Sequence, residues 1–205
     1  MPYQFQSPVI VQTADGSFPK ANISVPYISG GPSKEADTAI NKSVLAHVQD
    51  LVNSQGPLDD PRAEMIGYYE LKNNQKDILS LSLFNYAYTG GAHGLTLQLS
   101  LTFKQSTGQS YKLQDLFKPD SDYMAAINKI ISAQIKARKL EPIEPFDTIR
   151  TDQDFYIADR SLVVYFQLYE LMPYVYGFSY FPISVYELVN VINSDGPLGP
   201  MLENN

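Results

Sequence analysis

The strongest constraint on the fold is a strict two-residue alternation of leucine with small polar residues in the middle of the chain. Every second residue from Leu79 to Leu83 is leucine, and the same spacing runs from Leu95 to Phe103. Successive side chains of a strand point to opposite faces, so this period predicts two β-strands, each with one apolar and one polar face. The glycine-rich segment between them favours an antiparallel pair, with the apolar face buried and the polar face in water.

Two other segments follow the helical period. Apolar residues recur every three or four positions in residues 34–53, directly after Ser33, whose hydroxyl is suited to cap a helix. A second segment of this kind covers residues 122–139, with Asp120 or Ser121 as its cap and basic residues in its last turn. Both segments predict amphipathic helices.

Helices this few cannot join many parallel strands. The pattern therefore predicts an α+β fold of antiparallel sheets, each packed with a helix, in two small subdomains. The glycine- and proline-rich residues 196–200 are expected to fray. The shorter predicted strands are residues 9–11, 21–25, 155–158, 161–166 and 182–185, with turns at Asp15-Gly16 and Asp159-Arg160.

Charge and cysteine content exclude several classes of function. The chain has 15 Lys and Arg against 22 Asp and Glu, a net charge of −7, which leaves no broad basic face for nucleic acid. Cysteine is absent, so disulfides, thiolate metal sites and a cysteine nucleophile are excluded. The two histidines, His47 and His93, are too few for a three-histidine zinc site. We therefore expect no metal and no cofactor.

Targeting signals are not evident in the sequence. The first residues have neither the basic nor the long apolar region of a signal peptide. The most apolar stretch, residues 162–181, is interrupted by Glu170, Pro173 and Gly177, which makes it a poor membrane-spanning helix. The sequence fits both a cytoplasmic protein and an ectodomain from which a signal or anchor has been removed.

Aromatic residues concentrate between positions 155 and 186. Most of these rings are expected to build the core and cross-strand pairs. Tyr174, Tyr176 and Tyr180 fall in a predicted loop, where a tyrosine joins a rigid apolar ring to a hydroxyl and is suited to contact a partner.

The segment Gly90-Gly91-Ala92-His93-Gly94 allows two interpretations. It can be a structural glycine bulge with His93 hydrogen-bonded to the backbone, or a site where His93 acts as an acid, a base or a pH-sensitive contact. Its glycines, Gly91 among them, permit positive φ or close backbone approach. A phosphate-binding loop is excluded, because no Gly-Lys-Ser/Thr follows and no helix begins there.

Several segments together resemble a known family. Residues 86–94 (Tyr-Ala-Tyr-Thr-Gly-Gly-Ala-His-Gly), residues 155–157, residues 169–174 (Tyr-Glu-Leu-Met-Pro-Tyr) and Gly177 are similar to the bacterial pair of domains of unknown function in the ectodomain of the anti-sigma-V factor RsiV. A similar pair forms the N-terminal region of the peptidoglycan deacetylase PdaC. The resemblance places a PdaC N-terminal-like subdomain at residues 5–90 and an RsiV C-terminal-like subdomain at residues 95–192.

The resemblance implies an extracytoplasmic module of the cell envelope: periplasmic, at the cell surface or secreted. In the anti-sigma-V factor this ectodomain is a receptor for lysozyme, and in the deacetylase it precedes a separate catalytic domain. This sequence shows neither the metal ligands of that catalytic domain nor the sigma-binding segment and transmembrane helix of the anti-sigma factor. Neither deacetylation nor sigma-factor sequestration is therefore carried over.

We expect a non-catalytic binding module for lysozyme, another basic protein or cell-wall glycan, attached to a membrane only through an anchor outside this sequence. Two alternatives stay open: a structural or assembly domain of a lipoprotein, and a peptidoglycan-active enzyme using His93, with Glu170 near it in space. The oligomeric state is not indicated. The candidate ligand-binding residues are Gly91, His93, Tyr169, Glu170, Tyr174, Tyr176 and Tyr180.

Overall fold

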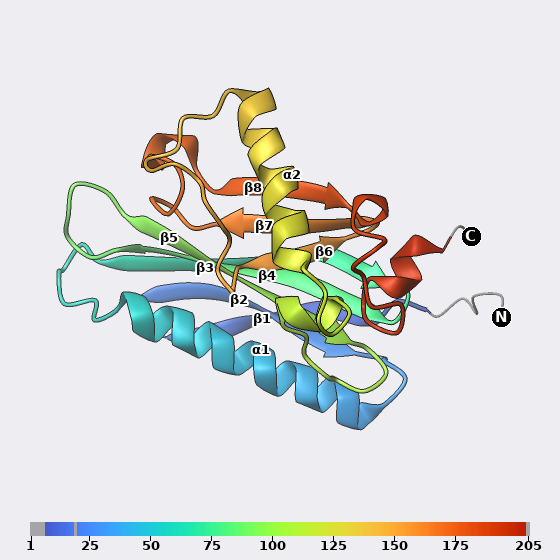
Figure 1. Ribbon diagram of the computed structural model, residues 1–205. Coiled ribbons are helices and arrows are strands. Elements are labelled where there is room, and N and C mark those ends of the chain that lie inside the picture. Colours follow the sequence, from blue (N-terminus) through green and yellow to red (C-terminus); the bar gives the residue numbers. More distant parts are fainter. Residues whose placement is uncertain (1–6, 19, 204–205) are drawn as a thin grey trace. The chain divides into compact units, whose positions relative to one another are not determined.

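The computed structural model describes residues 7–18 and 20–203, which form two compact units. Among these described residues, the N-terminal unit extends to Ser110 and the C-terminal unit begins at Tyr111. The division therefore follows strand β5 (Leu95–Lys104), whereas the sequence analysis placed the boundary between residues 90 and 95. The reason is that β5 pairs along its length with strand β4 (Ile78–Tyr88) and completes the first sheet (Figure 1).

The N-terminal unit is a five-stranded sheet in the order β1-β2-β3-β4-β5 with one long helix. Strands β1 and β2 form a hairpin, the helix α1 leads from β2 to a parallel β3, and β3, β4 and β5 form an antiparallel meander. The remaining bounds are β1 (Ile10–Phe18), β2 (Ala21–Ser29), α1 (Lys34–Gln55) and β3 (Glu64–Gln75).

Two details of this sheet differ from the sequence analysis. Asp15 and Gly16 lie inside β1, and the chain turns later, at Lys20. Strand β3 was not predicted, and it pairs in parallel with β2 over Met65–Gly67. A Cβ on Gly67 would lie 2.8 Å from the Ile23 side chain, so the close approach of β2 and β3 requires glycine there and interrupts the apolar pattern of β3.

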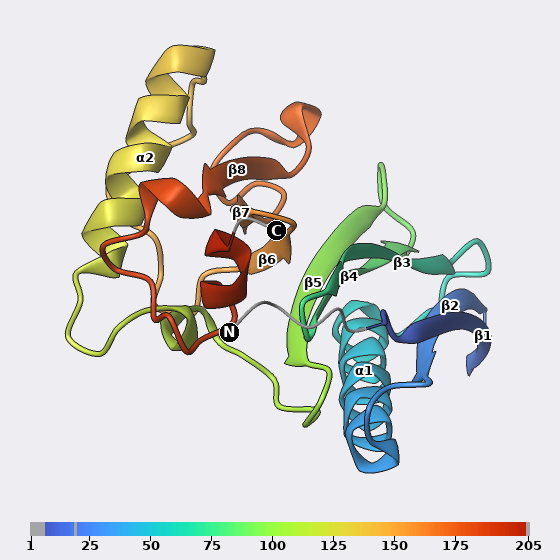
Figure 2. The same cartoon turned by 90° about the vertical axis from the view of Figure 1, so that its right-hand side faces the viewer.

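Helix α1 covers one face of the sheet (Figure 2). It begins as predicted, with the Ser33 hydroxyl accepting a hydrogen bond from the Ala36 backbone N–H at 3.2 Å. Its apolar stripe is buried against the leucines of β4, which confirms the amphipathic helix and the apolar face of the strand. The buried stripe consists of Ala36, Ile40, Val44, Val48 and Leu51.

The polar face of β4 and β5 is also buried, so the expectation of a face in water is wrong. Ser80 and Ser82 have no exposed surface. Their hydroxyls form cross-strand hydrogen bonds, Ser80 to Thr102 at 2.9 Å and Ser82 to Ser100 at 2.8 Å. A buried hydroxyl is tolerated when it is hydrogen-bonded, and this ladder satisfies that requirement.

The C-terminal unit is a three-stranded antiparallel sheet in the order β6-β7-β8, with the helix α2 beside β8 (Figure 2). Ile127 and Ile131 of α2 are fully buried, and the Arg138 guanidinium lies 5.3 Å from the centre of the Phe181 ring. Asp122 caps α2 by accepting a hydrogen bond from the Ala125 backbone N–H. The bounds are α2 (Tyr123–Arg138), β6 (Phe155–Ala158), β7 (Ser161–Phe166) and β8 (Ser179–Ser184).

The last described residues are packed, which corrects the expectation of fraying. Leu198 and Met201 have no exposed surface, and the chain forms a short 3₁₀ turn over Gly199–Leu202. The structure confirms an α+β fold with two subdomains. Within the described residues, no helix combines the length and the hydrophobicity that a membrane crossing needs.

Candidate functional site

The segment between β7 and β8, residues 167–178, is termed the aromatic loop. Leu171 and Met172 are buried and anchor it, and a 3₁₀ turn over Tyr174–Tyr176 forms its tip. The turn is closed by two backbone hydrogen bonds of 3.0 Å, from Tyr176 to Pro173 and from Gly177 to Tyr174. Gly177 has a φ of +70°, which favours glycine. The loop is therefore anchored by burial and by backbone hydrogen bonds.

The tip of the aromatic loop presents apolar surface to solvent. Val175 is 85% exposed, Tyr176 59% and Tyr169 50%. The rings of Tyr169 and Tyr174 stack with their centres 5.3 Å apart. Large side chains exposed together are typical of interaction sites, because burying them on binding is favourable.

A second segment lies alongside the loop. The backbone N–H of Ile143 donates to the carbonyl of Leu171 at 2.9 Å, which joins the linker 141–145 to the aromatic loop. Ile143 is exposed, and so are its neighbours Glu141 and Glu144. The linker therefore adds one apolar side chain and two carboxylates beside the loop.

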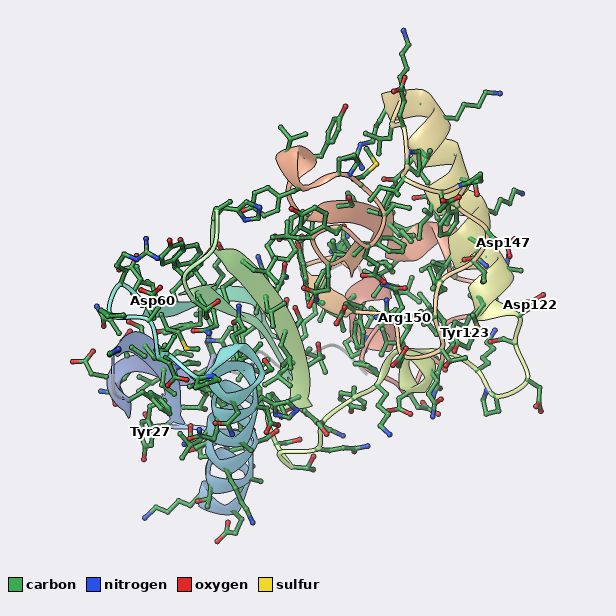
Figure 3. All side chains as sticks on the ribbon, turned by 90° about the vertical axis from the view of Figure 1, so that its left-hand side faces the viewer. Tyr27, Asp60, Asp122, Tyr123, Asp147 and Arg150 are labelled. Atoms are coloured by element: carbon green, nitrogen blue, oxygen red, sulfur yellow. The ribbon has the colours of Figure 1, made fainter. Side chains whose placement is uncertain are left out.

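The base of the aromatic loop is held by an ionic cluster around Arg150, a residue labelled in Figure 3. Its guanidinium pairs with Glu170, with Asp152 at 3.1 Å and with Asp154 at 3.5 Å. The second oxygen of Glu170 accepts the backbone N–H of Gln167 at 2.7 Å. We call these five residues the Arg150 cluster. One guanidinium faces three carboxylates, so two negative charges are uncompensated when all three are ionised.

Asp154 is a largely buried carboxylate of the Arg150 cluster, with 25% of its side chain exposed. Burial raises its pKa above the ordinary value of 3.8, against the lowering effects of the Gln167 amide and the Arg150 guanidinium. The Gln167 side-chain amide donates to Asp154 Oδ2 at 3.0 Å. In the sequence, Asp152 and Asp154 resemble a solvated acidic pair. In the structure only Asp152 is solvated. Asp154 is largely buried and accepts a hydrogen bond from the Gln167 amide at the base of the aromatic loop.

The predicted site residues of the C-terminal unit separate into two groups. Tyr169, Glu170, Tyr174 and Tyr176 lie together on the aromatic loop. Tyr180 does not: it is in β8, where its ring lies 5.8 Å from that of the fully buried Tyr165 and 6.2 Å from that of Tyr156. These three rings are cross-strand neighbours on one face of the sheet, as most of the aromatic residues were expected to be.

Gly91 and His93 belong to the N-terminal unit, in the loop between β4 and β5. Both are exposed, and His93 Nδ1 lies 2.8 Å from the carbonyl oxygen of Gly94. A Cβ on Gly90 would lie 2.4 Å from the Asp60 carboxylate, and one on Gly94 would overlap the Tyr86 ring. The packing at Gly90 and Gly94 favours the structural interpretation of this loop.

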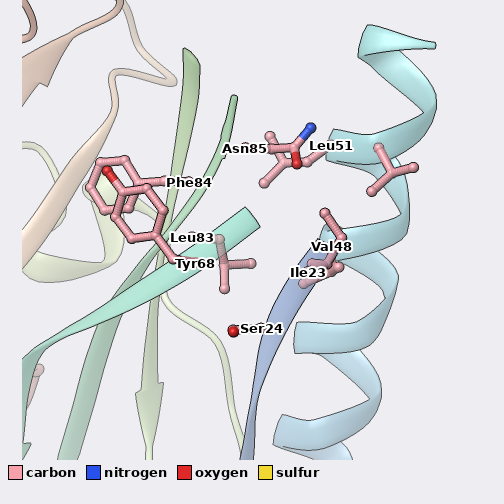
Figure 4. Close-up of a pocket in the computed structure, with 9 residues that line it drawn as sticks. Ile23, Ser24, Val48, Leu51, Tyr68, Leu83, Phe84 and Asn85 are labelled. Carbon is pink, nitrogen blue, oxygen red and sulfur yellow. The ribbon is translucent and has the colours of Figure 1, made fainter. Parts of the chain in front are cut away.

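The cavity shown in Figure 4, between α1 and the sheet, has a volume of about 10 Å³, so it holds nothing larger than a water molecule. His47 is held within α1, its Nδ1 lying 2.7 Å from the carbonyl oxygen of Ser43. Among residues 7–18 and 20–203, no three or more His, Asp or Glu side chains are placed to hold a metal ion.

The sequence analysis predicted Glu170 as a site residue, but it did not predict Ile143, Val175 or the other four members of the Arg150 cluster. The only local signal was the spacing Arg150, Asp152, Asp154, which a solvated loop explains equally well. Their proximity to Glu170 depends on the path of the chain through β6 and β7.

Two family models match the chain. The model described as "Protein of unknown function (DUF3298)" matches residues 114–186, and the model "Deacetylase PdaC" matches residues 15–96. The anti-sigma-V factor RsiV of Bacillus subtilis (strain 168) is 28% identical over 187 residues, covering 83% of this chain and 65% of the relative. The peptidoglycan-N-acetylmuramic acid deacetylase PdaC of the same organism is 23% identical over 111 residues, covering 52% of this chain.

The chain spans less than two thirds of the length of either relative, and only 24% of the deacetylase. These matches confirm the resemblance to the domain pair that RsiV and PdaC share.

Two solved structures share the fold. A member of the DUF3298 family from Bacteroides fragilis superposes with a TM-score of 0.68 at 17% identity, covering 98% of each chain. A DUF3298 family protein from Pseudomonas aeruginosa superposes with a TM-score of 0.66 at 15% identity, covering 100% of this chain and 99% of the other.

Proposed function

We propose that this chain is a non-catalytic, extracytoplasmic binding module of the bacterial cell envelope, and that its aromatic loop contacts a basic protein, with lysozyme the first ligand to test. The resemblance to the anti-sigma-V factor and to the PdaC deacetylase supports the envelope setting. The observation that carries the site is the exposure of Tyr169, Val175 and Tyr176 together on one anchored loop.

The anchoring supports a binding role. The aromatic loop is anchored by two buried side chains, Leu171 and Met172, and by the Arg150 cluster. An anchored loop would lose little conformational freedom on binding. Tyrosine combines a large contact area with few rotatable bonds and is enriched in protein interfaces. The tip of the loop thus has the composition and the support of a preorganised contact surface.

The charge around the loop favours a basic partner. Glu141, Glu144 and Asp152 are exposed, and the whole chain carries a net charge of −7. Opposite charges at the rim of an interface speed encounter, and their effect falls with salt. Aromatic residues at the centre and carboxylates around them would give a contact in which only part of the affinity depends on salt.

The first experiment is a calorimetric titration with a c-type lysozyme at low and at moderate salt. An unrelated protein of similar positive charge is the control. We expect saturable binding that persists at moderate salt and is absent with the control protein. Binding that disappears with salt, or that occurs equally with the control, would reduce the interaction to screened charge attraction and would contradict the proposal.

Variants then locate the site. Replacing Tyr174 and Tyr176 together by alanine is expected to weaken lysozyme binding by at least about tenfold, the effect of losing roughly 1.4 kcal/mol. Tyr27→Ala is the matched control, because Tyr27 is 50% exposed on β2 in the other unit. An unchanged affinity in the double variant would remove the aromatic loop from the site.

If lysozyme does not bind, the same variants are tested with peptidoglycan fragments. An assembly role is tested on the unliganded protein by sedimentation, since a homodimer that buries the aromatic loop over more than about 1,000 Å² would explain the exposed tyrosines instead. The enzymatic alternative is less well supported, because both carboxylate oxygens of Glu170 are engaged, by Arg150 and by the Gln167 backbone.

A further inference from the structure

A second hollow lies in the N-terminal unit, at the C-terminal end of α1. Its volume is about 540 Å³, within the range of small-molecule sites, and it is open to solvent. The end of β1, Lys20 after it, the last two turns of α1, the segment that follows α1 and the start of β3 contribute its walls. We call it the α1 hollow. It shares no residue with the aromatic loop.

A fixed cation lies in the wall of the α1 hollow. Among the described residues that line the hollow, Lys20 alone is charged. Its ammonium donates to the carbonyls of Leu58 at 2.8 Å and Asp60 at 3.2 Å, and its own carbonyl accepts the backbone N–H of Met65 at 3.2 Å. An ammonium has more N–H groups than these two bonds use, so it can still donate to a ligand.

The negative groups around the α1 hollow do not cancel this charge. The Val52 carbonyl at the end of α1 already accepts the Gly56 backbone N–H at 3.2 Å, and a helix end carries only a partial charge. The Asp60 carboxylate is bound by the Arg62 guanidinium at 2.9 Å and 3.1 Å, which compensates it. The ammonium therefore makes the α1 hollow favour an anionic ligand.

Apolar side chains form another part of the α1 hollow. Phe18, Val52 and Leu58 are half-buried there, and Met65 is almost completely buried beside them. Such a surface is suited to an aliphatic group, which gains from leaving water. Because these side chains and the ammonium share one lining, a ligand that carries a carboxylate next to an aliphatic group can use both.

Two primary amides line the α1 hollow, one turn of α1 apart. The Gln49 side-chain N–H donates to Asn53 Oδ1 at 2.8 Å. This bond orients both groups and leaves Gln49 Oε1 as an acceptor and the Asn53 NH₂ group as a donor. Both side chains are exposed. A peptide group carries a donor and an acceptor, so it can satisfy the two amides together.

We infer that the α1 hollow binds the C-terminal end of a peptide chain whose last residue is aliphatic. The Lys20 ammonium takes the terminal carboxylate, the apolar side chains take the last side chain, and the amide pair takes a preceding peptide group. The inference goes beyond the proposed function and does not rest on it. Its residues lie in the other unit and its ligand is different, so each can fail without the other.

The test is a titration of the ¹⁵N-labelled chain with N-acetyl-alanyl-leucine, followed by nuclear magnetic resonance. We expect the side-chain amide signals of Gln49 and Asn53 to shift, with a dissociation constant of about 1 mM. The C-terminal amide of the same dipeptide is expected to bind at least about tenfold more weakly, because it lacks the charge that pairs with Lys20. N-acetyl-alanyl-serine keeps the carboxylate but loses the aliphatic contact, and a loss of about tenfold is expected for it as well.

Variants of Lys20 test the cation. Lys20 has a φ of +56°, a conformation that favours glycine, so Lys20→Gly removes the ammonium while the turn is retained. This variant is expected to bind the dipeptide at least about tenfold more weakly, with its backbone amide signals outside the α1 hollow unchanged. Lys20→Arg keeps the charge and is expected to bind. Lys42→Ala is the matched control, because it removes an exposed lysine of α1 that is not in the lining.

Several results would overturn the inference: no shift of the two amides at about 10 mM dipeptide, equal binding of its C-terminal amide, or an equal loss in Lys42→Ala. Equal binding of hexanoate, which has a carboxylate and an aliphatic chain but no peptide group, would replace the peptide by a simple organic acid. The Tyr174→Ala/Tyr176→Ala variant separates the two proposals. It is expected to bind the dipeptide like the unmodified chain, and a loss there would move the peptide site to the aromatic loop.

Discussion

Replacing Gly90 by alanine tests whether the glycine-rich loop between β4 and β5 is structural. Gly90 has a φ of +98°, and a Cβ there would lie 2.4 Å from Asp60 Oδ2 and 3.0 Å from Asp60 Cγ. Gly91 is its neighbour and provides a matched control. A Cβ on Gly91 would have one contact within 4 Å, with the His93 carbonyl oxygen at 3.8 Å, an ordinary separation.

The expected magnitude follows from the backbone and from the steric contact. An L-residue held at positive φ costs about 1–2 kcal/mol of folding free energy. The added Cβ also pushes Asp60 away from its hydrogen bonds to the Arg62 backbone and guanidinium, which lowers stability further. In a unit of this size, 1 kcal/mol corresponds to roughly 4–8 °C in melting temperature. Gly91→Ala is expected to stay within about 0.5 kcal/mol of the unmodified chain.

The assay is urea unfolding followed by circular dichroism. Gly90→Ala should lower the midpoint without changing the slope, because the surface exposed on unfolding is the same. A double variant, Asp60→Ala with Gly90→Ala, should be less destabilised than the sum of the two single variants, since the steric part is relieved. The reasoning is refuted if Gly90→Ala and Gly91→Ala unfold at the same urea concentration.

Three further changes have expected outcomes in the same unfolding assay. Burial raises the pKa of Asp154, so ionisation of this carboxyl lowers the free energy of unfolding. Asp154→Asn cannot ionise, and its stability relative to the unmodified chain should therefore increase as pH rises through that raised pKa. The increase should vanish below the ordinary pKa of 3.8. A constant difference across pH would contradict this. Ser33→Ala removes the cap of α1 and should cost about 1 kcal/mol, whereas Ser33→Asp should cost little. Ile131→Ala leaves a cavity under α2 and should cost about 2–5 kcal/mol; a cost below about 1 kcal/mol would mean that α2 is not packed as described.

Elements with strong local signals were predicted well. Helix α1 combines a cap, an apolar stripe and a Gly-Pro stop, and its observed bounds differ by two residues from the prediction. The β6–β7 hairpin was equally clear from the turn signal of Asp159. In the structure Asp159 has a φ of +48°, a conformation that aspartate tolerates. Strand β3 was missed because Gly67 interrupts its pattern, and its parallel partner β2 is distant in the chain.

The candidate site could be predicted only in part. Tyr169, Tyr174 and Tyr176 are close in sequence between two strands, so one loop had to contain them. Tyr180 differs from them by belonging to β8, where strand pairing sets it beside other rings. The ionic partner of Glu170 is Arg150, which is 20 positions away in the chain, and no local pattern indicates that distance in space.

The sequence by itself determined the periods, the caps and the residue types: two amphipathic helices, the alternating strands, an acidic chain without cysteine, and a concentration of tyrosine near its end. Only the tertiary structure decided which of those tyrosines are buried and which meet solvent. Tyr165 and Tyr176 are chemically identical, yet one has no exposed surface and the other is 59% exposed. The serines of β4 are a second case: their alternation with leucine predicted exposure, and the structure buries them. A period reports to which face a side chain points, whereas burial depends on what the rest of the chain places over that face.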